Sequence, residues 1–200
     1  MSRSMLVVLC LFLPAMLVAQ NETPKVTVFG GYSLLRNGGN NSNGWNGQGT
    51  FNFTPYLGVT ADVSGNYRNL VSLPIPIVTA GVNQHLYTFL VGPTVTGNLG
   101  KVSVFGHALF GEALAGSSAG VSLPFIGGLN TNVNSANAFA MAFGGGLDLN
   151  LGRHFAIRPA QLDLVRTYFS TTDAVTTGLS SSTTGRQNFL RYSGGIVFRF

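Results

Sequence analysis

The sequence predicts an all-β fold, an antiparallel barrel of eight strands, from three observations. Charged residues make up only 8% of the chain, whereas an ordinary globular protein carries about 25%. After residue 20, no stretch approaches the roughly 18 continuous apolar residues that a membrane-spanning helix needs. Eight segments instead place large apolar residues at every second position, which is the period of a strand whose two faces meet different surroundings.

Residues 1–19 have the three parts of a secretory signal peptide. Arg3 precedes an apolar core that starts at Met5, and a small residue, Ala19, ends the segment. The only cysteine, Cys10, lies in this segment and follows a leucine, where a lipoprotein signal would have a small residue. We therefore expect cleavage after Ala19, no lipid anchor and a cysteine-free exported chain. Residues 24–200 are expected to form one barrel domain.

The first four alternating segments predict four strands. Each has one face of large apolar residues and one face of small or polar residues. In the second segment, for example, Trp45 and Phe51 share one face while Asn46 and Gln48 share the other. The large faces in chain order are Val26, Val28, Tyr32 and Leu34; Trp45, Gly47, Gly49, Phe51 and Phe53; Leu57, Val59, Ala61, Val63 and Tyr67; and Tyr87, Phe89, Val91 and Val95.

The sixth and eighth segments alternate in the same way. Alanine and glycine dominate the slim face of the sixth, and Arg191 and Arg199 lie on the slim face of the eighth. The large faces are Phe139, Met141, Phe143, Leu147 and Leu149 in the sixth, and Leu190, Tyr192, Ile196, Phe198 and Phe200 in the eighth.

The fifth and seventh segments are less regular. In the fifth, which starts at Val102, we place His107 inward and Glu112 toward the outer rim, although the opposite phase stays open. In the seventh, Arg158 and Asp163 have an odd spacing, so both face inward only if one extra residue is inserted between them. Pro159 cannot donate a ladder hydrogen bond, which makes it the expected place for this bulge.

Short and long connections alternate strictly, as in an up-and-down meander with both chain ends on the short-turn side. The strands are expected to be about 9 to 14 residues long, enough to cross a bilayer when tilted. Short turns are expected at 54–55, 98–101 and 151–154, and long loops at 36–44, 69–84, 117–137 and 170–186.

The chemistry of the slim face predicts which solvent each face meets. A soluble, lipocalin-like barrel also has eight alternating strands, but its outer face needs Lys and Glu for hydration. Here the slim face is mostly Gly, Ala, Ser, Thr and Asn, which suits a crowded barrel interior. The sequence therefore predicts a transmembrane barrel with its large face in lipid. A few ions are expected to pair across the interior: Asp62, Arg158, Asp163, Arg191 and Arg199.

Aromatic residues on the large face gather toward the two ends of the expected strands, as in the interfacial girdles of membrane barrels. Tyr56, Phe155 and Phe200 fall near the short turns. The girdle expected near the long loops consists of Tyr32, Trp45, Tyr67, Tyr87, Tyr168 and Tyr192.

The chain resembles the small eight-stranded outer-membrane barrels of the OmpA/OmpX-like superfamily, over essentially all of residues 24–200. The closing stretch SGGIVFRF is the most specific match, through Ser193, Gly195, Phe198 and Phe200. In such proteins this ending is read by the barrel assembly machinery. The resemblance implies location in the outer membrane of a Gram-negative-type bacterium, with short periplasmic turns and four longer extracellular loops.

No catalytic, cofactor-binding or metal-binding residues are predicted. None of the three histidines is followed two residues later by a serine, which is the pattern that the lipid A deacylase type would show. No two acidic residues are adjacent in the sequence, and the mature chain has no cysteine to serve as a metal ligand. His107 and Asp148 are expected at most to share a hydrogen bond inside the barrel. The net charge of +5 has no clustered basic patch, so nucleic-acid binding is not expected.

The sequence therefore predicts a non-enzymatic barrel with a structural or surface-interaction role and with outer-membrane lipids as its surroundings. Two expected loops, VSLPIPIVTAGV from Val71 and VSLPFIGGL from Val121, are more apolar than exposed loops usually are. We expect them to pack against each other as a lid or to extend the barrel wall. The alternative is contact with lipopolysaccharide, another envelope protein or a host surface. An outer-leaflet lipid-modifying enzyme and a narrow pore for small solutes remain as alternatives.

Overall fold

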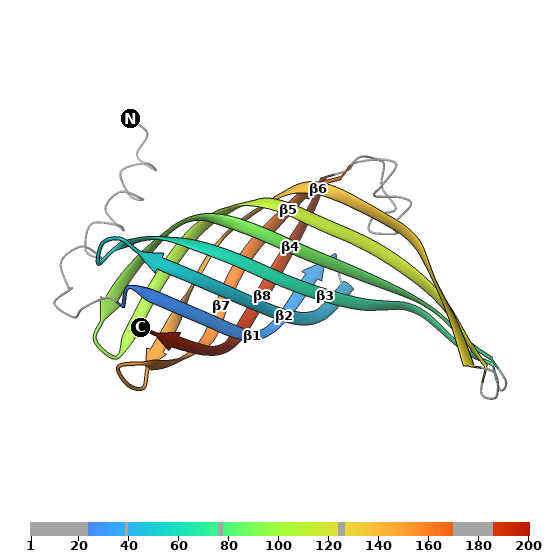
Figure 1. Cartoon of the computed structure of the whole chain (residues 1–200), viewed down its shortest axis with the longest axis horizontal. Helices are drawn as coiled ribbons and strands as arrows, with labels where there is room; N and C mark the ends of the chain where they lie inside the picture. Colours follow the sequence, from blue (N-terminus) through green and yellow to red (C-terminus); the bar gives the residue numbers. More distant parts are fainter. Residues whose placement is uncertain (1–23, 39, 76–77, 124–126, 170–185) are drawn as a thin grey trace.

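A computed structural model of the chain describes residues 24–38, 40–75, 78–123, 127–169 and 186–200. These residues form one closed, all-antiparallel barrel in which each strand pairs with its neighbours in sequence and β8 pairs with β1 (Figure 1). The predicted fold class is confirmed. The strands are β1 (Val26–Asn37), β2 (Asn40–Asn52), β3 (Leu57–Ile75), β4 (Val78–Leu99), β5 (Val102–Leu123), β6 (Gly127–Asn150), β7 (Phe155–Tyr168) and β8 (Arg186–Arg199).

The two faces of the wall follow the predicted alternation. Large apolar side chains such as Phe51, Phe89 and Phe143 are exposed on the outside. Asn46, Asp62 and other polar side chains of the slim face are buried inside. No helix long and apolar enough to cross a membrane occurs in the described part of the chain.

The two less regular strands resolve as expected. In β5, His107 is buried and Glu112 is exposed, which settles the phase that the sequence left open. In β7, the register against β8 shifts between Arg158 and Gln161, at the predicted bulge around Pro159. Arg158 and Asp163 are consequently both buried inside the barrel.

The strands are longer than predicted, and the difference is concentrated at one end. β3, β4, β5 and β6 contain 19, 22, 22 and 24 residues, so segments 69–84 and 117–137 are largely strand rather than loop. Segment 36–44 is also mostly strand, with Gly38 in the left-handed region (φ 53°) at its turn. Segment 170–186 lies almost wholly outside the described residues, as does the expected signal peptide.

The long strands project beyond the barrel as a four-stranded sheet, seen at the right of Figure 1. Pairing of β2 with β3 ends at Tyr67, and pairing of β6 with β7 ends at Phe139. Past these residues the pairs β3–β4, β4–β5 and β5–β6 continue to the hairpin tips. We call this part the projecting sheet, and the opposite end, where the start of β1, the C-terminus and the three short turns lie, the short-turn end.

Candidate functional site

The aromatic residues predicted to form a girdle lie on the outer face, but not all in one ring. Tyr32 of β1 is the register partner of Trp45 of β2. The rings of Tyr67 and Tyr87, on β3 and β4, meet edge to face with centroids 5.9 Å apart. These four residues thus form a cluster on the outside of β1 to β4.

The other two predicted girdle residues lie on β7 and β8. Tyr168 is stacked under the Arg186 guanidinium, 5.4 Å from the ring centroid. Tyr192 lies near the middle of β8, and its hydroxyl donates to the carbonyl of Pro159 at 2.6 Å. This bond ties Tyr192 to the bulge around Pro159.

The residues of the predicted assembly signal occupy both faces of β8. Phe198 and Phe200 point outward and are 49% and 69% exposed, whereas Ser193 is buried in the interior. The last residue also closes the barrel, because the amide of Phe200 donates to the carbonyl of Val26 and the amide of Val26 donates back to Phe200.

An ionic network fills the middle of the barrel. Arg191 is fully buried and donates to Asp62 of β3 (2.9 Å) and to Asp163 of β7 (2.8 Å). Strands β8 and β3 are not neighbours, so this arginine bridges the interior. Asn46 and Gln48 of β2 also donate to Asp62, at 2.8 and 2.7 Å. The predicted pairing of ions across the interior is confirmed.

A second arginine extends the network toward the short-turn end. Arg158 donates to Asp148 at 2.7 Å and to the side-chain oxygens of Gln48 and Gln161, also at 2.7 Å. Arg199 reaches the same Asp148 at 3.3 Å. Gln48 and Gln161 each bond to both halves, so the two halves are continuous. Three arginines face three aspartates, and the charges balance among the described interior residues.

His107 bonds to Asp163, at 2.8 Å, and not to Asp148 as the sequence led us to expect. The register explains the difference, because Asp148 lies opposite Ser103, which is too far along β5 from His107 for a hydrogen bond. The register partner of His107 is Gly144, whose missing side chain leaves room for Asp163 to reach across β6. A Cβ atom on Gly144 would lie 2.1 Å from the Asp163 carboxylate.

Sequence reasoning missed two aromatic residues inside the barrel. Phe29 and Phe105 are buried, and the Arg158 guanidinium lies between them, 4.4 and 4.0 Å from their ring centroids. Such stacking suits a guanidinium that is removed from water. Both residues occupy slim-face positions of their strands. A large ring at an inward-facing position could therefore have been recognised in the sequence.

An apolar layer closes the interior on the side of the projecting sheet. Leu90, Leu109 and Val165 are at most 3% exposed and lie in one cluster with several alanines. The sequence predicted small groups here, and the alanines of β5 and β6 confirm this. Buried polar side chains lie among the apolar ones, including Thr88, Thr167 and Gln187. The complete layer is Leu35, Leu86, Leu90, Leu109, Ala113, Ala115, Ala136, Ala138, Ala140, Ala142, Val165, Phe169 and Phe189.

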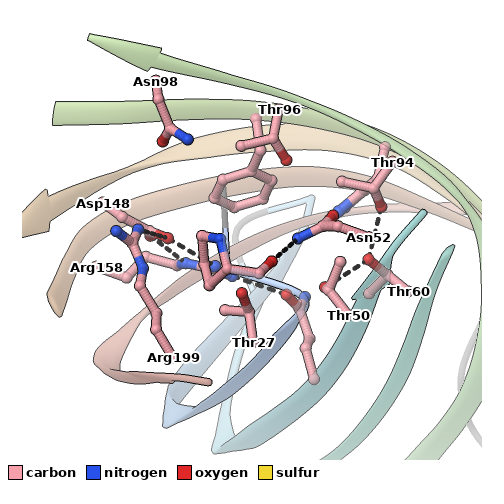
Figure 2. Close-up of a pocket in the computed structure, with 14 residues that line it drawn as sticks. Thr27, Thr50, Asn52, Thr60, Thr94, Thr96, Asn98, Asp148, Arg158 and Arg199 are labelled. Atoms are coloured by element: carbon pink, nitrogen blue, oxygen red, sulfur yellow. Dashed lines mark hydrogen bonds and ion pairs between the residues drawn. The ribbon is translucent and has the colours of Figure 1, made fainter. Parts of the chain in front are cut away.

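A small cavity lies on the other side of the ionic network, at the short-turn end (Figure 2). Its volume is about 30 Å³. Part of its wall is formed by Asp148 and the two arginines that pair with it, Arg158 and Arg199. A row of threonine hydroxyls forms another part. In that row, Thr60 bonds to Thr50 at 2.7 Å and to Thr94 at 2.6 Å.

Among the described residues, no three side chains of His, Cys, Asp or Glu gather as a metal site. In the same part of the chain, His107 is the histidine that pairs with a carboxylate, and it is buried within the ionic network, away from the outer surface.

Comparison of the sequence with protein-family models gives no match, and comparison with curated proteins gives none either. Among solved structures, the chain is similar to Ail, the attachment invasion locus protein of Yersinia pestis, in complex with the heparin analogue sucrose octasulfate. The identity is 18% and the TM-score 0.52, over 88% of this chain and 96% of that chain. A second structure of Ail shows 17% identity and a TM-score of 0.49, over 89% and 99% of the two chains. Neisserial surface protein A shows 10% identity and a TM-score of 0.40, over 88% and 96%.

Similarity at this level of identity concerns the fold. The chain has the fold of the small eight-stranded outer-membrane barrels, as the match to the sucrose octasulfate complex of Ail shows over nearly the whole of both chains.

Proposed function

We propose that the chain is an integral protein of the outer membrane of a Gram-negative-type bacterium, with a non-enzymatic surface-interaction role. Two features support an outer-membrane location: the apolar outer face of the wall and the likeness of the fold to Ail. The interior supports a non-enzymatic role, since its ions bond to one another and leave the wall without an exposed catalytic pair.

The observation that carries the interaction role is the projecting sheet. A barrel that only had to cross the bilayer needs strands of about 9–11 residues, yet β3 to β6 are at least 19 residues long. Extended strands outside the bilayer expose main-chain donors and acceptors along both edges of the sheet. Among the described residues, Arg68–Ile75 pair only with β4 and Gly127–Ala138 pair only with β5.

The two edges differ in their chemistry. The β3 edge contains Arg68 and Pro74, and charge and proline are the usual means of blocking strand addition. The β6 edge, Gly127–Ala138, contains neither proline nor a charged residue. An extended polypeptide can therefore add to the β6 edge through main-chain hydrogen bonds. We propose that an extended segment of another surface protein binds to this edge.

Bacteria that express the chain allow a direct test. The variant Asn130→Lys adds one charge to the β6 edge, and Asn69→Lys adds one to the β3 edge as the matched control. We expect the wild type and the control to promote adhesion to cultured epithelial cells, and the β6 variant to lose most of this effect. Equal adhesion of all three, or none above cells without the chain, would refute the role.

The same cells test the non-enzymatic part of the proposal. Mass spectra of lipid A should be identical with and without overexpression of the chain. Any new lipid A species that depends on the chain would favour a lipid-modifying enzyme instead.

We also propose that Ser193, Gly195, Phe198 and Phe200 direct insertion by the barrel assembly machinery. Phe200→Ser should reduce the heat-modifiable, folded fraction in cells while leaving refolding of purified protein in detergent nearly unchanged. Phe53→Ser is the control, because Phe53 is similarly exposed (61%) at the same end of the barrel. Equal loss in both variants, or equal loss in cells and in detergent, would contradict a signal at the C-terminus.

A further inference from the structure

A second cavity lies at the mouth of the barrel, at the end of the interior away from the short turns. Its volume is about 40 Å³. Asn37 ends β1 and Asn40 begins β2, so the cavity lies beside the turn of this hairpin. Leu35 and Phe189, from the apolar layer, form its buried floor. The rest of the wall consists of Ser42, Arg68 and Gln84, and we call this space the mouth cavity.

Arg68 brings a positive charge to the mouth cavity without a counterion among the described residues. Its guanidinium donates to Asn40 Oδ1 at 2.8 Å, and this oxygen belongs to a neutral amide. The acidic side chains of the described chain lie elsewhere: Asp62, Asp148 and Asp163 in the ionic network, and Glu112 on the outer face. The guanidinium has further N–H donors in a planar fork that matches a carboxylate. The cavity therefore favours an anion.

The volume limits how much of an anion enters. A single water molecule requires roughly 10–15 Å³ of such volume, so the mouth cavity holds about three non-hydrogen atoms. A carboxylate group has this size. A free ion would lose hydration against Leu35 and Phe189 and gain no hydrogen bond from them. The geometry therefore suits a carboxylate on a carbon atom that faces this floor, with the rest of the molecule above the cavity.

The polar groups around the mouth match a molecule that is rich in hydroxyl groups. Asn37 carries an amide, which donates and accepts at once, and Ser42 carries a hydroxyl. Gln187 lies two residues nearer the mouth than Phe189, on the same inner face of β8, and is 5% exposed. Neither the nitrogen nor the oxygen of its amide has a hydrogen-bond partner among the described residues. Because a buried amide without partners is destabilising, this group points to a ligand that covers the mouth.

We propose that the mouth cavity binds the carboxylate of an acidic sugar residue. Arg68 is the charged partner, and the amides of Asn37 and Gln187 bond to hydroxyls of the sugar. The inference rests on the proposed surface-interaction role, for which it names a ligand class at a site separate from the β6 edge.

Glucuronic acid and glucose test the proposal as a matched pair, since they differ in the carboxylate. Each is titrated onto the purified, folded chain in detergent micelles and followed by calorimetry. We expect glucose to bind at least about tenfold more weakly than glucuronate, because it lacks the charge-assisted bonds to Arg68. Equal binding of the two sugars, or no saturable binding of glucuronate, would overturn the proposal.

Variants of two arginines test the charged partner. Arg68→Gln removes the charge and keeps an amide, and Arg36→Gln is the control, because Arg36 is exposed on the outside of β1. We expect Arg68→Gln to weaken glucuronate binding about tenfold or more and Arg36→Gln to change it less than about twofold. Equal effects of the two variants would refute the site.

A second pair of variants serves if Arg68→Gln fails to fold. Ser42→Trp fills the mouth cavity from β2, whereas Asn41→Trp places the same ring on the exposed side of that strand. Glucuronate binding should be lost in the first variant and kept in the second. Binding by both would contradict a site in this cavity.

Two further probes separate the sugar from other carboxylates. Acetate carries the group without a sugar, and a glutamate peptide carries it on a polypeptide. If either binds as tightly as glucuronate, the assignment to an acidic sugar is wrong. Adhesion separates this inference from the proposed function: adhesion without glucuronate binding refutes the mouth cavity alone, and glucuronate binding without adhesion refutes the surface-interaction role alone.

Discussion

Arg191 is held by two carboxylates that come from opposite parts of the barrel, Asp62 and Asp163. All three side chains are fully buried. Removing the arginine leaves two negative charges without a counterion, and breaking a buried pair in this way typically costs about 3–5 kcal/mol. We therefore expect Arg191→Met to lower the free energy of unfolding by that amount, measured by urea denaturation in lipid vesicles.

The control removes the charges together. Adding Asp62→Asn and Asp163→Asn to Arg191→Met leaves no buried charge uncompensated, and uncharged replacement of buried ion pairs is often close to neutral. The triple variant should recover most of the stability that the single variant loses. A triple variant less stable than the single one would show that the arginine acts through packing and not through its charge.

Phe143 tests which face of the wall meets lipid. Its side chain is 44% exposed on the outside of β6, which lies between β5 and β7 in the wall. Arginine on the lipid face near mid-depth costs about 2–4 kcal/mol, so Phe143→Arg should lower the free energy of unfolding in vesicles by that amount. Phe143→Leu, the control, should cost much less. A small effect of arginine would mean that this face is not in hydrocarbon.

At the scale of the element, the bulge in β7 decides which side chains reach the interior. It adds one residue between Arg158 and Gln161 relative to β8, so both Arg158 and Asp163 point inward. Deleting Pro159 would restore regular alternation and turn Arg158 toward lipid, away from Asp148 and Gln48. We expect this variant to lose its folded, heat-modifiable form on gels.

Deletion of Gly152 provides the comparison for chain length. Gly152 lies in the turn between β6 and β7, and nothing lies within 4 Å of where its side chain would be. This deletion should keep the folded form. If the two deletions have the same effect, the role of the bulge is not to keep Arg158 and Asp163 on the same face of β7.

The sequence predicted the strand centres and faces well because a barrel wall whose two faces meet different surroundings imposes alternation. Trp45 and Asn46, or Phe143 and Ala142, cannot exchange faces without placing a polar group in lipid or a large ring in the interior. The strand ends were not predictable in the same way. Segments 69–84 and 117–137 contain Pro, Gly, Ser and Asn and lack this regular alternation, so strands that continue there were read as loops.

The interior site was only partly predictable for a related reason. The ions at inward positions were visible in the sequence, but their partners depend on the register between strands. Asp163 reaches His107 only because β5 and β6 align His107 with Gly144. Nothing in the sequence of one strand specifies its alignment with the next, so Asp148 was an equally reasonable candidate.

For the whole molecule, the interior has three levels along its axis: the cavity, the ionic network and the apolar layer. Barrels of eight strands have just enough interior for side chains to fill, and here buried arginines and leucines fill it. We expect the purified chain in planar bilayers to give no steady ionic current. A stable current proportional to voltage would show that the network opens, and would favour a pore.

The unequal lengths of the strands also bear on the order in which the barrel forms. The longest pairings join strands that follow one another directly, from β3 to β6. The seam between β1 and β8 joins the two extremes of the chain through a shorter ladder, from Thr27 to Arg36. Bringing distant segments together costs more entropy than closing a hairpin. We therefore expect the central hairpins to form early and the pairing of β1 with β8 to form last. Until then, the edges of β1 and β8 stay open to whatever helper protein guides insertion.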